Sequence, residues 1–432
     1  MPTHSLSARL LAGAIALPLG AATLAGGAAV AAPAGTTIDV ATTGKDTNAG
    51  TAAAPLKTVQ AAIDKAKPGT TIRIHKGTYN QQLLIRKSGT ASAPITVTNA
   101  GDGTVTITSD QPAESCDSRQ PSPRRTVLMQ AGSDYWTFRG LSIHNGIYIN
   151  GGGAHAVYTW HDDLVDARNW EPRRAVPGAS KNDPVAAKTA VAYMEKVLGR
   201  SLNPADGNQF IGNRITGRGI HATFARSGVI KDNVITEVTC GTGPGIWLIA
   251  FSNFWQVTGN DVSHIADSGD THFMQEGIRL GSASNYNVVA RNKVHDLGDD
   301  GRGIATDVDA SFNTFEYNTV TNVPIGYNDE MSGWGNIWRK NTVTNFTILG
   351  FGFRMKDRVL KVPSKDTSTH YSIVADNVAT AGRKGAAGLS IGAIAGSKFS
   401  GNTFGKINLG SYVSGYWAKQ GNTWNGTTKP PS

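Results

Sequence analysis

Acidic and basic side chains that could do chemistry are gathered in one stretch of the second half of the chain. The segment ATDVD carries Asp307 and Asp309, the segment NDEMS carries Glu330, and the segment FRMK carries Arg354 and Lys356. Calcium prefers carboxylate oxygens, so the three acids could hold a calcium ion. Alternatively, one carboxyl group could act as a general acid beside an ionised partner. The third possibility is a surface ion-pair ladder, which would contribute little stability.

A repeated unit must position these segments. Two near-copies of one pattern, FEYNTVTNV and IWRKNTVTNF, each follow an acidic segment. Within them, Asn followed two residues later by an apolar residue recurs along the chain, at Asn213, Asn233, Asn260, Asn292, Asn318, Asn341, Asn402 and Asn422, with a looser match at Asn377. The first five gaps are 20, 27, 32, 26 and 23 residues, and such unequal gaps favour β-solenoid coils with variable turns over helical repeats of fixed size. We expect a structural ladder of asparagines that hydrogen-bond neighbouring backbone groups.

Aligning the coils on this ladder brings Ile220, Ile246, Ile278, Ile304 and Tyr327 to one position, at the start of a strand. Strand side chains alternate between two faces, so these residues should face the core and their neighbours should face outward. One outward column then reads His221, Trp247, Arg279, Ala305, Asn328 and Gly352, and the next reads Thr223, Ile249, Gly281, Asp307, Glu330 and Arg354.

Adjacent coils lie about 4.8 Å apart, so the carboxyl groups of Asp307 and Glu330 should be neighbours, with Arg354 one coil further. Asp329 would point inward unless a bulge re-aims it. Upstream, Glu276 and the turn 299–302, which ends in Arg302, add charge near the same edge.

The N-terminal part predicts a short helix followed by short strands. Leu56 to Ala66 has apolar residues at helical spacing, and Lys67-Pro68-Gly69 stops it. Thr71 to Ile74 then predicts a strand that Gly77-Thr78-Tyr79 breaks, and the segments LLIRKSG and APITVTNAG predict further strands.

This region resembles the entry coil of secreted right-handed parallel β-helix proteins, the pectin-lyase-like superfamily of polysaccharide lyases and glycoside hydrolases. The resemblance is carried by Gly50-Thr51, Pro55, Thr58, Ala61-Ala62, Ala66, Gly69 to Ile72, Gly77 to Tyr79, Ser88 to Thr90 and Ala93 to Val97. It implies an all-β, right-handed parallel β-helix solenoid, with a short N-terminal helix that caps its open end and protects the first strand edge.

The acidic stretch is similar to the sites of two families within this superfamily. Similarity to pectate lyases implies calcium on Asp307, Asp309 and Glu330, with Arg354 removing the sugar C5 proton. Similarity to polygalacturonases rests on Thr306-Asp307, Asp329-Glu330 and Arg354-Met355-Lys356, the last of which would grip a uronate, although the Gly-His-Gly coil of that family is missing.

Residues 1–31 predict a cleaved secretion signal, with Arg9, an apolar run and the cleavage site Ala29-Val30-Ala31. An uncleaved membrane anchor is the alternative, and no other stretch is apolar enough to span a membrane.

The formal net charge of +9 favours anionic partners. Of these we expect acidic polysaccharide and no nucleic acid. Cys116 and Cys240 could form a disulfide or remain separate thiols.

We therefore predict a signal at residues 1–31 and one β-helix domain at 32–428, interrupted by an excursion at 160–206 with a helical segment at 184–199. The excursion could cover a groove or only pack on the solenoid.

The predicted function is that of a secreted, monomeric enzyme that cleaves an acidic polysaccharide by β-elimination. Hydrolysis by a carboxylate pair and non-catalytic glycan binding or adhesion are the alternatives. The predicted catalytic residues are Arg354, Asp307, Glu330 and Lys356, and the predicted substrate-binding residues are Arg279, His221 and Trp247.

Overall fold

The computed structural model describes residues 35–109, 125–152, 201–239, 243–265, 275–298, 301–307, 310–330, 333–353, 369–392, 394–410, 414–415 and 417–431. Residues 35–432 form one compact unit. The predicted signal, both cysteines and the helical segment at 184–199 lie outside the described residues. In the described part of the chain, no helix is both long and apolar enough to cross a membrane.

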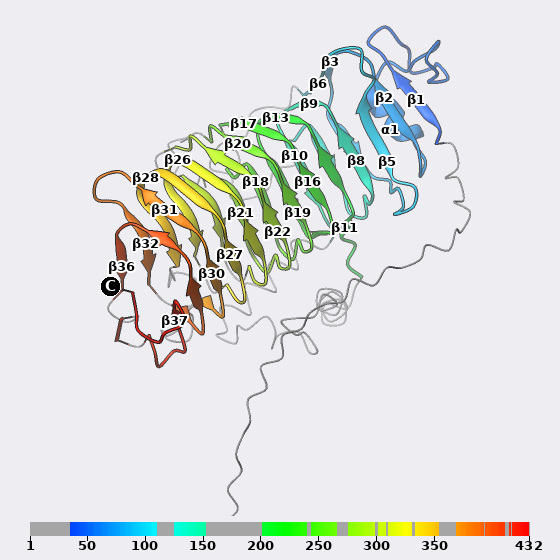
Figure 1. Cartoon of the computed structure of the whole chain (residues 1–432). Helices are drawn as coiled ribbons and strands as arrows, with labels where there is room; N and C mark the ends of the chain where they lie inside the picture. The colour runs from blue at the N-terminus through cyan, green and yellow to red at the C-terminus, as the bar shows by residue number, and fades with distance from the viewer. Residues whose placement is uncertain are drawn as a thin grey trace, which may run out of the picture. The chain divides into compact units, whose positions relative to one another are not determined.

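Short parallel strands wind into stacked coils with three faces (Figure 1). The first face is a 13-stranded sheet. In spatial order, it contains β1 (Thr37–Val40), β2 (Thr71–Ile74), β5 (Ile95–Asn99), β8 (Trp136–Arg139), β12 (Gln209–Ile211), β16 (Val229–Lys231), β19 (Gln256–Thr258), β22 (Val288–Ala290), β25 (Thr314–Glu316), β27 (Ile337–Arg339), β30 (Ile373–Ala375), β34 (Lys398–Ser400) and β37 (Thr423–Trp424).

The other two faces share two long strands, β26 (Thr319–Asp329) and β28 (Thr342–Phe353), which continue round the corner between them. The second face also contains β3 (Gly77–Asn80), β6 (Val105–Thr108), β9 (Ser142–His144), β13 (Arg214–Gly217), β17 (Val234–Val238), β20 (Asp261–Ser263), β23 (Lys293–His295), β31 (Val378–Ala381) and β35 (Thr403–Phe404).

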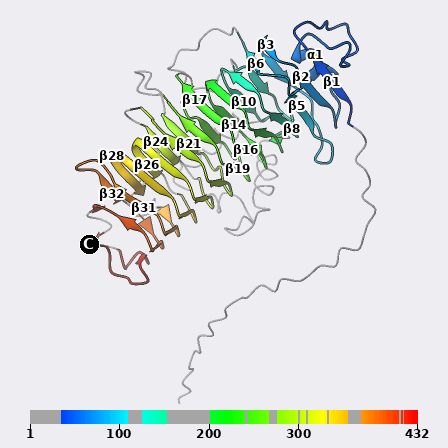
Figure 2. The same ribbon diagram turned by 45° about the horizontal axis from the view of Figure 1, so that its top comes forward.

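The third face carries the predicted site. Besides the second halves of β26 and β28, it contains β4 (Leu83–Ile85), β7 (Val127–Met129), β10 (Ile147–Asn150), β14 (Ile220–Thr223), β18 (Ile246–Ile249), β21 (Glu276–Leu280), β24 (Arg302–Thr306), β32 (Ala387–Ile391) and β36 (Ile407–Leu409). The turned view in Figure 2 shows β21, β24, β26 and β28 lying side by side. Two small sheets pair β11 (Ala205–Asp206) with β15 (Ala225–Arg226) and β29 (Thr369–His370) with β33 (Ile394–Ala395).

The predicted N-terminal helix is confirmed as α1 (Val59–Lys65). The side chain of Thr58 caps it by accepting a hydrogen bond from the Ala61 backbone N–H. The buried helix residues Val59, Ala62 and Ile63 belong to the same core as the first strands. The predicted strand is confirmed as β2 and ends before Gly77 as expected, but Gly77 to Tyr79 are themselves part of β3, which starts the second face after the chain turns a corner.

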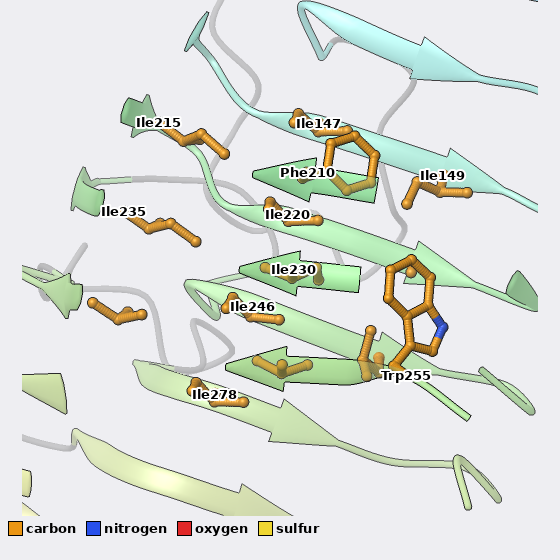
Figure 3. Packing of buried hydrophobic residues seen from close by; sticks show 14 of the residues in the cluster. Ile147, Ile149, Phe210, Ile215, Ile220, Ile230, Ile235, Ile246, Trp255 and Ile278 are labelled. Atoms are coloured by element: carbon orange, nitrogen blue, oxygen red, sulfur yellow. The ribbon is translucent and has the colours of Figure 1, made fainter. Parts of the chain in front are cut away.

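One continuous apolar core fills the solenoid. Figure 3 shows the column that Ile147, Ile220, Ile246 and Ile278 form on successive coils of the third face. Each coil alone could not bury its apolar side chains, so stacking of neighbouring coils creates the core. This column confirms the coil alignment expected from the asparagines.

The asparagine ladder is confirmed between Asn213 and Asn402. In each step, a side-chain oxygen accepts a hydrogen bond from the backbone N–H of the preceding asparagine, at 2.9–3.0 Å. Asn377, which matched the repeat loosely, is a full member between Asn341 and Asn402.

Asn422 was wrongly assigned to this ladder. Its side-chain oxygen accepts from the Ser397 N–H at 3.0 Å, beside the first face. A second run of buried asparagines, Asn287, Asn313 and Asn336, is linked in the same way at 2.8–2.9 Å. These residues precede first-face strands, so the coils that carry them have two turns held by asparagine side chains.

Candidate functional site on the third face

The first outward column has the predicted register. Successive parallel pairings align His221 with Trp247, Trp247 with Arg279, Arg279 with Ala305, Ala305 with Asn328, and Asn328 with Gly352. The same column extends upstream to Tyr148, which pairs with His221. The core residues on either side of each position point inward, so these side chains lie on the outer side of the sheet.

The second outward column is continued by backbone hydrogen bonds just beyond the strands. The N–H of Asp307 donates to Leu280 O at 2.8 Å, and the N–H of Glu330 donates to Thr306 O at 3.3 Å. Asp307 and Glu330 are therefore neighbours on consecutive coils, as expected.

Five charged residues form what we call the charge cluster: Glu276, Arg279, Arg302, Asp307 and Glu330. The Arg279 guanidinium binds Glu276 at 2.6 Å and also forms an ion pair with Asp307. The Arg302 guanidinium bridges Glu276 at 2.9 Å and Glu330 at 3.3 Å. Three carboxylates thus alternate with two guanidinium groups across three coils.

Glycines at the corner before the third face bring Glu276 and Arg302 together. Gly277 and Gly303 follow these two residues directly. A Cβ atom on Gly303 would lie 2.5 Å from the Gly326 carbonyl oxygen, and one on Gly277 would lie 2.7 Å from that of Gly303. Only glycine allows this close approach of backbones, which sets Glu276 and Arg302 in register on adjacent coils.

Burial divides the charge cluster into an inner and an outer part. The side chains of Glu276, Arg279 and Glu330 are 1%, 5% and 5% exposed, whereas those of Asp307 and Arg302 are 16% and 22% exposed. Burial lowers the pKa of Arg279, but the charges of Asp307, Glu276 and Glu330 outweigh it and raise the pKa above its ordinary value. Arg279 is therefore a permanent cation, and a solvent-borne ligand would meet Arg302 and Asp307 first.

An aromatic stack, defined as Tyr148, His221 and Trp247, adjoins the charge cluster. The Tyr148 and His221 ring centroids are 5.1 Å apart, and the His221 and Trp247 rings stack at 4.4 Å. The Arg279 guanidinium lies 5.7 Å from the Trp247 ring centroid, in cation–π contact. Trp247 is thus covered by protein groups on both sides along the column, so the stack positions Arg279. Sugar binding by His221 and Trp247 stays a prediction.

His221 is held neutral. Burial lowers its pKa well below the ordinary value, and the charge of Arg125 lowers the pKa further. The His221 Nε2 atom lies 3.2 Å from the Thr223 hydroxyl.

Asp329 points inward, as the register predicted, and no bulge re-aims it. Its carboxyl group accepts hydrogen bonds from the Thr306 hydroxyl at 2.8 Å and from the Asn336 side chain at 3.3 Å. Burial raises the pKa of Asp329 to about 6, against the opposing effect of these hydrogen bonds. The carboxyl group therefore lies behind the sheet and not among the outward charges.

Some predicted site residues lie outside the described residues, namely Asp309, Arg354 and Lys356. Their predicted roles, like those of the described residues, stay predictions. The sequence had indicated Glu276 and Arg302 only as nearby charges. Their pairing with Arg279 and Glu330 could have been suspected from the glycines that follow both residues.

Among the described residues, no group of three or more His, Cys, Asp or Glu is arranged to hold a metal ion. In the charge cluster, the carboxylates of Asp307 and Glu330 each form an ion pair with a guanidinium group. Asp309, the third predicted calcium ligand, is not described.

Comparison with known proteins gives two family matches. The model for the periplasmic copper-binding protein NosD matches residues 128–354, which is more than half of the chain. The model for the Pel9A-like right-handed β-helix region matches residues 38–165.

Similar proteins match over shorter spans. Pectate lyase PEL9 of Emericella nidulans is 34% identical over 155 residues, which cover 34% of this chain and 37% of that protein. The uncharacterized protein YwoF of Bacillus subtilis is 32% identical over 122 residues, which cover 27% of this chain and 26% of that protein. The chain thus spans about a third or less of the length of these curated relatives. The crystal structure of pectate lyase Pel9A is 13% identical, with a TM-score of 0.44, and the match covers 92% of this chain and 82% of that one.

The parallel coils and the family matches lead to the same assignment. The strands pair in parallel throughout the three faces, and the N-terminal part matches a right-handed β-helix model that covers α1 and the first coils. The chain belongs to the NosD family of right-handed parallel β-helix proteins, within the pectin-lyase-like superfamily.

Proposed function

We propose that this protein is an extracellular or periplasmic enzyme that cleaves a uronate-containing polysaccharide by β-elimination. One observation carries the proposal: two guanidinium groups are fixed by three carboxylates on the outer side of the third face. The partial similarity to a pectate lyase supports the same class of substrate.

β-Elimination requires a fixed positive charge at the uronate carboxylate. A base removes the C5 proton, the C4–O bond breaks, its electron pair leaves with the oxygen, and a C4–C5 double bond forms. Negative charge develops on the carboxylate during proton removal, and preorganised cations stabilise it. Arg302 is the more exposed of the two guanidinium groups. Arg279 is more deeply buried, and its ion pairs with Asp307 and Glu276 stabilise its positive charge.

Asp307 and Glu330 would hold these guanidinium groups in place during the reaction. The base is proposed to be Arg354, and Lys356 is proposed to assist it, as the sequence predicts. Neutral His221 and the aromatic stack would keep Arg279 oriented through its contact with Trp247.

Calcium on Asp307, Asp309 and Glu330 stays a prediction. The two described carboxylates do not by themselves fit this ion, since each is already paired with a guanidinium group that would repel it. We therefore derive no step through calcium, and loss of cleavage in the presence of a chelator is the result that the calcium prediction requires. Loss of cleavage would indicate a site that includes Asp309.

Hydrolysis by Asp307 and Glu330 is the second candidate. It is favoured by their position on consecutive coils, because a spacing of about 4.8 Å is close to the carboxyl separation of about 5–5.5 Å in retaining glycosidases. Non-catalytic glycan binding remains the third candidate.

The test is a panel of polygalacturonate, alginate, glucuronan and glycosaminoglycan, read both for near-ultraviolet absorbance of unsaturated products and for reducing ends. A lyase gives both signals, a hydrolase gives reducing ends alone, and a binding protein gives neither. Arg302→Ala and Arg354→Ala should each lower the rate about 100-fold or more, with the fold checked by circular dichroism.

Arg339→Ala is the matched control. Its guanidinium pairs with Glu316 at 2.6 Å on the first face, away from the charge cluster. It should leave the rate unchanged. If Arg302→Ala and Arg354→Ala both retain full activity, the site lies elsewhere.

A further inference from the structure

Asn328 presents a polar group that the folded chain does not satisfy. The residue is fully buried, yet neither its amide nitrogen nor its amide oxygen has a hydrogen-bond partner in the part of the chain that the structure describes. Leaving a buried donor or acceptor unsatisfied costs about 1–3 kcal/mol per group. The asparagines of the ladders, by contrast, form hydrogen bonds through their side-chain amides. Asn328 therefore differs from them in having an unsatisfied side chain.

Small residues flank Asn328 on the column, and charged side chains lie on the neighbouring coils. Its neighbours on adjacent coils, Ala305 and Gly352, are small, and along the described strands only Ala305 stands between Asn328 and Arg279 on this column. Arg302 is aligned with Ile325, but its guanidinium reaches Glu330 at 3.3 Å. The Arg302 side chain therefore extends along the coil that carries Asn328.

The chemistry of these groups selects one class of ligand. An amide both donates and accepts hydrogen bonds, while the partly exposed Arg302 guanidinium can hydrogen-bond a carboxylate. A monatomic anion would leave the amide oxygen without a donor, and a metal cation would leave the amide nitrogen without an acceptor. A sugar unit with hydroxyl groups and a carboxylate satisfies all of them.

We propose that Asn328 is a specificity-determining residue whose amide binds the hydroxyl groups of a uronosyl unit while Arg302 meets its carboxylate. This deepens the proposed function and rests on it for the choice of substrate. The stability lost through the unsatisfied amide is recovered when the sugar binds.

The experiment compares wild-type protein with Asn328→Leu, Asn328→Ala and Asn408→Leu. Asn408 lies on the same column, two coils beyond Gly352, and is exposed, which makes it the matched control. Binding of galacturonate, alginate and glucuronate oligomers is measured by calorimetry, and cleavage of the corresponding polymers is measured separately. Thermal unfolding is followed for every variant.

We expect both Asn328 variants to weaken binding and to lower kcat/KM by roughly ten- to hundredfold, since a site built to hydrogen-bond hydroxyl groups depends on each partner. Asn328→Leu should keep or raise the unfolding midpoint, because it removes an unsatisfied buried group. Asn408→Leu should match the wild type. If Asn328→Leu does not fold, Asn328→Ala decides the question.

Unchanged binding and cleavage in the Asn328 variants overturn the proposal while the lyase function stands. Wild-type binding without cleavage, if weakened by the Asn328 variants, rejects the lyase function and supports the subsite. Absence of wild-type binding to every oligomer overturns both.

Discussion

Buried Asp329 should make the stability of the solenoid depend on pH. The unfolded chain ionises this carboxyl group near its ordinary pKa of 3.8, whereas the folded protein retains the proton up to about pH 6. Between these values the folded state binds more protons than the unfolded state, so the free energy of unfolding falls as pH rises. The contribution of the Asp329 carboxyl group to the free energy of unfolding is fully present below about pH 4 and is lost above about pH 6.

The magnitude follows from the difference between the two pKa values, about 6 and 3.8. At about 1.4 kcal/mol per pKa unit, the loss is about 3 kcal/mol. Asp329→Asn keeps the size of the side chain and can keep its bonds to Thr306 and Asn336 by exchanging donor and acceptor roles. The variant should therefore match the wild type near pH 4 and exceed its stability by up to about 3 kcal/mol at pH 7.

Urea unfolding followed by circular dichroism and by tryptophan fluorescence, from pH 4 to pH 7, would measure this difference. Coincidence of the two probes is needed, because solenoids can unfold in parts. Asp232→Asn is the control, since the Asp232 side chain is 57% exposed. A stability difference between Asp329→Asn and the wild type that does not change with pH would refute the reasoning.

Two further predictions concern the buried polar network. Arg279→Met leaves Glu276 and Asp307 without their shared guanidinium. Because Asp307 then loses its ion pair with Arg279 whereas Glu276 keeps the one with Arg302, we expect the free energy of unfolding to fall by about 3 kcal/mol in chemical denaturation, and pairing Arg279→Met with Asp307→Asn should recover part of it. Asn292→Ala removes the acceptor of the Asn260 N–H, at 3.0 Å, and the donor to Val257 O, at 2.9 Å. It should destabilise the protein by about 1–3 kcal/mol, while Asn408→Ala, at an exposed position, should change stability little; equal effects of the two would contradict a structural ladder.

The coil register on the third face could be predicted from the amino-acid sequence alone. Strand alternation is a local property and the asparagine repeat marks one turn of each coil, so counting back from Asn292, Asn318 and Asn341 was enough to place Arg279 and Asn328 on one column. The inward position of Asp329 followed from the same alternation.

The pairing of the charged side chains could not be predicted in this way and follows from the folded arrangement of the coils. Glu276 and Arg302 sit at a corner where backbones approach closely, and the turns between coils vary in length, so spacing along the chain could not show that Arg302 reaches both Glu276 and Glu330. The second run of asparagines, Asn287, Asn313 and Asn336, was also missed, because it lies at a different turn of the coil and does not share the first ladder's pattern. Local periodicity thus fixes which face a side chain occupies, whereas its partner depends on how separate coils meet in space.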